Sequence, residues 1–88
     1  MLKVNVSKDS VKRLTALAKS SGLSKDKAVV WVIMETAMPT INKRDKVSRT
    51  ESLNLKLSEP ALEIVTLVAE RYGVKADVVI DAYLSRQM

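Results

Sequence analysis

The chain has 88 residues, of which 47% are hydrophobic, and a formal net charge of +5 from 15 Lys and Arg against 10 Asp and Glu. This length predicts one domain, and the apolar fraction argues against disorder. Cysteine and histidine are absent, which excludes disulfides and removes the commonest nucleophiles, general bases and zinc ligands. We therefore expect neither an enzyme nor a cofactor, and the basic charge favours a polyanionic partner, chiefly nucleic acid.

The sequence also lacks the features of a membrane or secreted protein. No segment approaches the roughly 18 consecutive apolar residues that cross a bilayer. The N-terminus has no long apolar stretch of the kind found in a signal peptide. We expect a cytoplasmic protein with no membrane contact, and the absence of cysteine agrees with a reducing compartment.

The first segment, residues 2–7, alternates apolar and polar residues, which predicts a half-buried strand. Ser7 is suited to cap a following helix, and Gly22 stands where a left-handed C-cap belongs. Between them, apolar residues recur with the period of a helix that buries one face. These residues are Val11, Leu14, Leu17 and Ala18.

A second helix is predicted from about Ser24, a good N-cap residue. The run from Ala28 to Met34 is rich in β-branched residues, and local propensity favours a strand there. We interpret it as a helix because its counterpart later in the chain is helical. A helix that is apolar on all sides should be fully buried, or should bury its extra face against a second molecule. Trp31 is accordingly interpreted as a core or self-association residue.

Residues 39–51 break both patterns and are interpreted as a linker. Pro39 is expected to end the helix, and the segment is mostly polar. Extended, it could span roughly 43 Å, enough to cross a small domain. Its cations either contact a nucleic-acid backbone or are simply solvated. They are Lys43, Arg44, Lys46 and Arg49.

The remaining chain repeats the first segment at an offset of 51 positions. Residues 53–58 alternate like residues 2–7, and Gly73 corresponds to Gly22. Six identities occur over the 36 aligned positions (2–37 against 53–88). A second helix is predicted from about Lys75. The apolar helical faces of this copy contain Leu62, Val65, Val68 and Ala69, then Val79, Ile80, Tyr83 and Leu84.

One strand cannot be stable without a partner, so we expect the two strands to pair antiparallel beneath four helices. The chain is then one domain over residues 1–88, with repeat one at 2–38, the linker at 39–51 and repeat two at 52–88. The predicted fold is mainly α with a two-stranded antiparallel β-ribbon. Its acidic residues are interpreted as helix caps and surface charge; they are Asp9, Asp26, Asp77 and Asp81.

This frame resembles the ribbon-helix-helix DNA-binding family of the Arc, MetJ and CopG type. The resemblance rests on Leu53-Asn-Leu-Lys-Leu-Ser-Glu with Ala69 and Gly73, and on Leu2-Lys-Val-Asn-Val-Ser with Ala18 and Gly22. Family members normally pair two identical chains. Here the resemblance implies two ribbon-helix-helix repeats forming an intramolecular pseudodimer, with double-stranded DNA as partner and possible self-association on adjacent sites.

The resemblance also implies which residues contact DNA. In that family the ribbon enters the major groove, which makes the expected base readers Lys3, Asn5, Asn54 and Lys56. Asn can bond adenine through two atoms and Lys can donate to guanine. The start of the second helix holds a phosphate, which implies Ser24, Lys25 and Lys75 as phosphate contacts. The second copy lacks the serine of the first at this place.

Three functions remain open. The first is a sequence-specific transcriptional regulator, such as a repressor, from a plasmid, a virus or a host. The second is a relaxosome or partition accessory protein with the same DNA chemistry but a structural role. The third is an antitoxin-type module that binds a protein partner through the apolar face around Trp31. Because the two copies differ, we expect the DNA site to be asymmetric.

Overall fold

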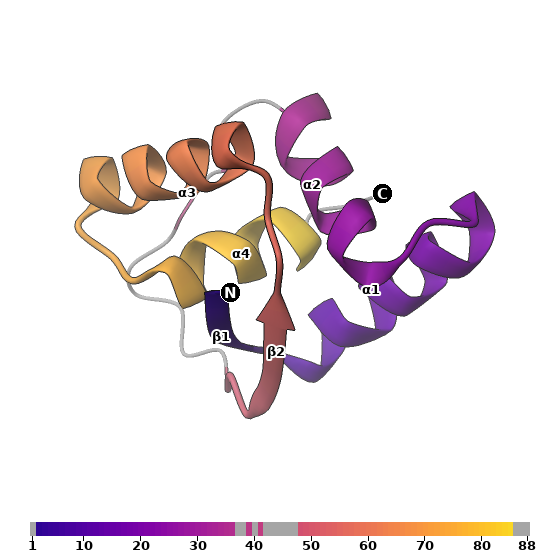
Figure 1. Ribbon diagram of the computed structural model, residues 1–88. Helices are drawn as coiled ribbons and strands as arrows, with labels where there is room; N and C mark the ends of the chain where they lie inside the picture. The colour runs from indigo at the N-terminus through magenta and orange to yellow at the C-terminus, as the bar shows by residue number, and fades with distance from the viewer. Residues whose placement is uncertain (1, 37–38, 40, 42–47, 86–88) are drawn as a thin grey trace.

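A computed structural model of the chain describes residues 2–36, 39, 41 and 48–85. In these residues it is mainly helical with one two-stranded sheet, as the sequence predicts (Figure 1). The same order, strand then two helices, occurs twice. The elements are β1 (Leu2–Val6), α1 (Lys8–Ser21), α2 (Lys25–Glu35), β2 (Glu51–Leu55), α3 (Glu59–Tyr72) and α4 (Ala76–Ser85).

The two strands pair antiparallel, with Lys3 opposite Asn54 and with Val4 opposite Leu53 at the centre of the ribbon. Leu2 is opposite Leu55 and Val6 is opposite Glu51. This register corrects the predicted bounds of the second strand. It begins at Glu51, a residue predicted to belong to the linker, and ends at Leu55 rather than at residue 58. The ladder stops there because Leu55 pairs with the first residue of β1.

The apolar side of the ribbon closes the hydrophobic core against the helices. Val4, Val6 and Leu55 are almost fully buried. Helix α4 packs on β1. Helices from different copies also contact each other, because α1 packs on α4 and α2 packs on α3. The predicted face of α4 is confirmed, because Val79, Ile80, Tyr83 and Leu84 are all buried.

The predicted face of α3 is wrong at one residue. Val65 and Val68 are buried, but Leu62 is 42% exposed. Leu62 lies in the first turn of α3, beside Ala61, which is fully buried. The helix therefore enters the core through Ala61, and the leucine next to it is turned outward.

Helix α2 forms where local propensity favoured a strand, so the interpretation from the repeat is confirmed. The expectation that it is buried on all sides is wrong. Trp31 is 47% and Met34 50% exposed, while Ala28, Val29, Val32 and Ile33 are buried. These four residues form one stripe along α2, and the core contacts the helix only along that stripe. Trp31 is thus not a core residue.

Among the described residues of the linker, Pro39 and Ile41 are buried. Ile41 is buried among the apolar side chains, and Arg49 is partly buried. The predicted cations Lys43, Arg44 and Lys46 lie outside the described residues. The linker between α2 and β2 therefore also contributes buried side chains, in addition to connecting the two copies.

The predicted helix caps are largely confirmed. The Ser7 hydroxyl accepts a hydrogen bond from the Ser10 backbone N–H, and the Ser24 hydroxyl accepts one from Lys27. Gly22 and Gly73 end α1 and α3 at φ 71° and 65°, left-handed values that favour glycine. Ser58 occupies the N-cap of α3 but makes no capping hydrogen bond through its side chain.

Candidate nucleic-acid interface

The exposed side of the β-ribbon carries polar side chains from both strands. Lys3 and Asn5 on β1, and Ser52 and Asn54 on β2, are all exposed. The register sets Lys3 directly opposite Asn54 and Asn5 opposite Ser52. Directly opposed side chains in an antiparallel pair have Cβ atoms about 5 Å apart, so these four form one continuous polar surface.

The alternation of the sequence creates this surface. Successive side chains of a strand point to opposite faces. Because Val4 and Val6 are buried in the core, Lys3 and Asn5 must point to solvent. The predicted readers Lys3, Asn5 and Asn54 are therefore brought together on one face. Lys56 is also exposed, but it lies one residue beyond the end of β2.

The predicted phosphate contacts lie at two separate helix starts, and the second is beside β1, where Leu2, Val74 and Ala76 line one pocket. Ser24 is the N-cap of α2, and Lys25 is its exposed first residue. Lys75 precedes α4, and its carbonyl oxygen accepts the first hydrogen bonds of that helix, from Val78 and Val79. Lysine has no acceptor on its side chain, so it cannot cap α4 as Ser24 caps α2.

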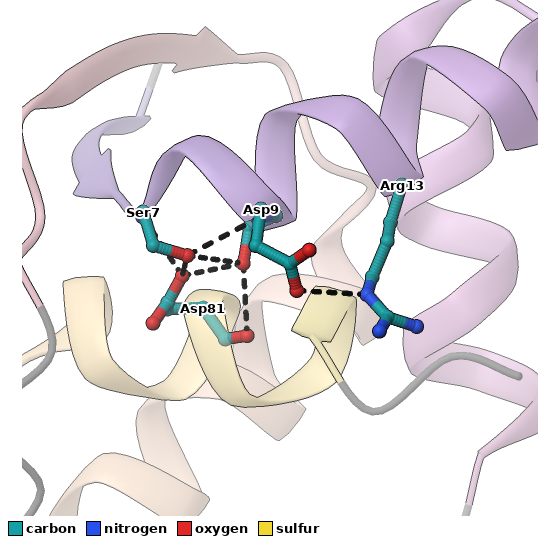
Figure 2. A network of polar contacts seen from close by, with 5 residues as sticks. Ser7, Asp9, Arg13 and Asp81 are labelled. Carbon is teal, nitrogen blue, oxygen red and sulfur yellow. Dashed lines mark hydrogen bonds and ion pairs between the residues drawn. The ribbon is translucent and has the colours of Figure 1, made fainter.

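A buried polar cluster fixes the ribbon to the helices behind it (Figure 2). Asp81 on α4 is only 3% exposed. Its Oδ1 atom accepts hydrogen bonds from the backbone N–H of Ser7 at 2.9 Å and from the hydroxyl of Ser7 at 2.9 Å. The hydroxyl of Ser10 donates to the same oxygen. Because Ser7 directly follows β1, these bonds hold the strand end and the α1 start against α4.

Arg49 completes this cluster from the linker side. Its Nε atom lies 3.3 Å from Oδ2 of Asp81, and its side chain is 23% exposed. The carboxylate thus has a cation on one oxygen and three donors on the other. A buried charge is stable only when paired and hydrogen-bonded in this way. The chain leading into β2 is therefore tied to α4 as well.

Sequence reasoning missed Asp81, which it interpreted as surface charge. A comparison of the two copies could have indicated that Asp81 is buried. At an offset of 51 positions, Asp81 corresponds to Val30 and Ser10 corresponds to Ala61. Two polar residues thus replace two apolar ones at places that pack together. The cluster lies between α1 and α4, whereas the equivalent positions on α3 and α2 are apolar.

Other kinds of site are not supported in the described parts of the chain. In residues 2–36, 39, 41 and 48–85, no group of three or more acidic side chains is placed to hold a metal ion. Nor is any helix there long and apolar enough to span a membrane. Comparison of the chain with protein-family models, curated proteins and solved structures found no match.

Proposed function

We propose that this protein binds double-stranded DNA in a sequence-specific manner by inserting its β-ribbon into the major groove. One observation carries the proposal. Lys3 and Asn54, which occupy the same place in the two copies, lie directly opposite each other on the exposed face of the ribbon. A two-stranded ribbon fits the major groove, which is about 12 Å wide.

The side chains on that face suit base recognition. Asn5 and Asn54 have both a donor and an acceptor, which matches N7 and N6 of adenine. Lys3 and Lys56 donate only, which matches O6 and N7 of guanine. These four residues are the proposed base readers, and the rigid core beneath β1 and β2 holds them in place.

Phosphate contacts would fix the register of the ribbon in the groove. Backbone N–H groups at the start of a helix point toward an anion. Ser24, Lys25 and Lys75 stand at the starts of α2 and α4 and are exposed. We assign them to the DNA backbone, where they add affinity without sequence preference.

The two copies are proposed to act as an intramolecular pseudodimer. The strand register sets Lys3 opposite its own equivalent residue, Asn54, and each copy packs its first helix on the other's second helix. The pseudodimer would present Lys and Asn in opposite order on its two strands. We therefore expect it to prefer a DNA site with two unlike halves.

Amide shift mapping tests this proposal. A ¹⁵N-labelled sample is titrated with a short mixed-sequence duplex at low salt. The largest shifts are expected in β1 and β2 and at Ser24, Lys25 and Lys75. Shifts concentrated around Trp31, or no shifts at all, would remove the ribbon as the DNA-contacting surface.

The biological role divides into two proposals that share this chemistry. As a transcriptional repressor, the protein would lower expression from a promoter that contains its site. As a relaxosome or partition accessory protein, it would bend its site without changing transcription. A reporter assay and a circular-permutation bending assay on the same site separate the two.

A protein-binding module is a second candidate function, favoured by the exposure of Trp31 and Met34 on α2. Exposed aromatic residues are enriched at protein interfaces. If this is the function, Trp31→Ala abolishes co-purification of a partner and leaves DNA affinity unchanged. Retention of the partner by the variant rules this candidate out.

A further inference from the structure

Helices α1 and α3 carry opposite charges at equivalent positions. At the offset of 51 that relates the copies, each lysine of α1 corresponds to a glutamate of α3. All six side chains are exposed. The pairs are Lys8 with Glu59, Lys12 with Glu63, and Lys19 with Glu70. This inversion distinguishes the two outer faces of the protein.

The two faces lie on opposite sides of the molecule. In Figure 1, α1 and α3 occupy the two flanks, with α4 and β2 between them. Residues 12 and 19 are seven apart, two helical turns, and so are residues 63 and 70. Each helix therefore presents its charges as a stripe along its outward side. We call these the lysine stripe (Lys8, Lys12, Lys19) and the glutamate stripe (Glu59, Glu63, Glu70).

The glutamate stripe also contains apolar side chains that remain in solvent. Leu67 is 64% and Leu62 42% exposed. On the lysine stripe, the position equivalent to Leu67 is Ala16, which is also exposed. A leucine on one face and a small residue at the same place on the other allow two helices to pack closely. The faces are thus complementary in charge and in size.

We propose that neighbouring copies of this chain associate head to tail, with the lysine stripe of one against the glutamate stripe of the next. The copies are identical, so every chain has one face of each kind. A contact between unlike faces does not close on itself in a dimer; it continues from copy to copy, as a ring where the rotation closes and as an open row where it does not. A molecule built from two identical repeats would instead carry the same charge on both flanks, so neighbouring copies would repel each other there.

The proposed contact has a defined consequence on DNA, and in this respect it rests on the proposed function. Each exposed ion pair is weak and is screened by salt. Adjacent sites on one duplex raise the effective concentration of the second chain. All chains in a row point the same way along the duplex. We therefore expect cooperative binding to two sites in direct repeat and independent binding to two sites in inverted repeat.

A chemical test in the absence of DNA addresses the contact alone. Equal amounts of ¹⁴N and ¹⁵N chains are mixed at low salt and treated with a carbodiimide, which joins amines to carboxylates in direct contact. Mass spectrometry is expected to find mixed-isotope peptides joining Lys12 or Lys19 to Glu63 or Glu70, and to lose them in 0.5 M salt, where the Debye length falls to about 4 Å. If every cross-linked peptide pair carries a single isotope, the cross-links lie within one chain and the proposed contact is overturned. This result does not depend on whether the chain binds DNA.

Charge-swap variants test the contact on DNA. Binding is measured on one site, two direct repeats and two inverted repeats. Wild type is expected to bind the second direct repeat about five- to tenfold more tightly than a single site. Glu63→Lys with Glu70→Lys should remove this gain and preserve single-site affinity. Lys12→Glu with Lys19→Glu should also remove it, and combining all four substitutions should restore it.

Three results would overturn the proposal. The first is equal cooperativity on direct and inverted repeats. The second is a fourfold variant that folds by circular dichroism and binds one site but shows no recovery. The third is a loss of single-site affinity in the Lys12→Glu, Lys19→Glu variant together with unchanged cooperativity in the Glu63→Lys, Glu70→Lys variant. That result would assign the lysine stripe to the DNA backbone.

Discussion

Asp81 accepts hydrogen bonds from both the backbone N–H and the hydroxyl of Ser7, each at 2.9 Å, across 74 positions of the chain. Helix α4 thus holds the junction between β1 and α1. Because the proposed DNA-contacting residues Lys3 and Asn5 belong to that strand, this buried cluster links stability to the shape of the ribbon.

Replacing Asp81 by Asn tests the stability that this cluster supplies. The amide keeps the size of the side chain but removes the charge that pairs with Arg49 and weakens the bonds from Ser7 and Ser10. We expect the free energy of unfolding to fall by about 1–3 kcal/mol. Urea denaturation measures it, with Glu35→Gln as control, since Glu35 is exposed and loses the same charge. Equal stability of the two variants would show that the cluster is not stabilising.

Asn54→Ala tests base reading. Because Asn54 is exposed, we expect no change in stability beyond about 0.5 kcal/mol. Affinity for the preferred duplex should fall by about 1–3 kcal/mol, and preference should relax at one base pair. Fluorescence anisotropy on duplexes substituted one base pair at a time measures both. Thr15→Ala, exposed on α1, is the control and should bind like wild type. Unchanged base preference in Asn54→Ala would contradict its assignment as a reader.

Lys75→Ala tests the phosphate contact at the start of α4. A contact to the DNA phosphate backbone does not depend on the base sequence. Affinity should therefore fall by the same factor for preferred and unrelated duplexes. The slope of log affinity against log salt should decrease in magnitude by about 1. Lys19→Ala removes the same charge from α1 and should leave the slope on a single-site duplex unchanged. Loss of affinity for the preferred duplex only would instead assign Lys75 to base reading.

Tyr83→Phe tests the effect of burial at high pH. Burial raises the pKa of the Tyr83 hydroxyl above its ordinary value of 10.0, because the phenolate is poorly solvated in the core. The folded chain therefore holds this proton more tightly than the unfolded chain. The resulting stability is complete below pH 10.0 and is lost as the pH rises through the raised pKa.

Urea denaturation of both proteins between pH 8 and pH 11 measures this difference. The phenylalanine variant is the matched control for the lysines that also titrate there. The wild type should lose stability relative to Tyr83→Phe above pH 10.0. Parallel curves for the two proteins would contradict the inferred burial effect.

The sequence predicted the parts of this fold that follow from short-range periodicity. Strand alternation located β1, and Gly22 and Gly73 marked the helix ends that the structure confirms. The repeat correctly identified α2 as a helix against its local propensity. The exposed positions of Lys3 and Asn54 also followed from alternation, although no periodic pattern specifies what the side chains bind.

The remaining features depend on contacts between distant segments. The bounds of β2 depend on the register with β1, which pairs Leu55 with Leu2. Burial of Asp81 depends on Ser7, Ser10 and Arg49 arriving from two other parts of the chain. Exposure of Trp31 depends on how little of α2 the core can cover. The local sequence pattern predicts none of these three features, because each depends on tertiary packing.

The most direct test of the central proposal is selection of bound duplexes from a random-sequence DNA library, followed by sequencing. A pseudodimer that reads DNA through Lys3, Asn5, Asn54 and Lys56 should enrich one site with two unlike halves. An enriched palindrome bound by one chain per half would contradict the pseudodimer. No enrichment over the starting library would contradict sequence-specific DNA binding altogether.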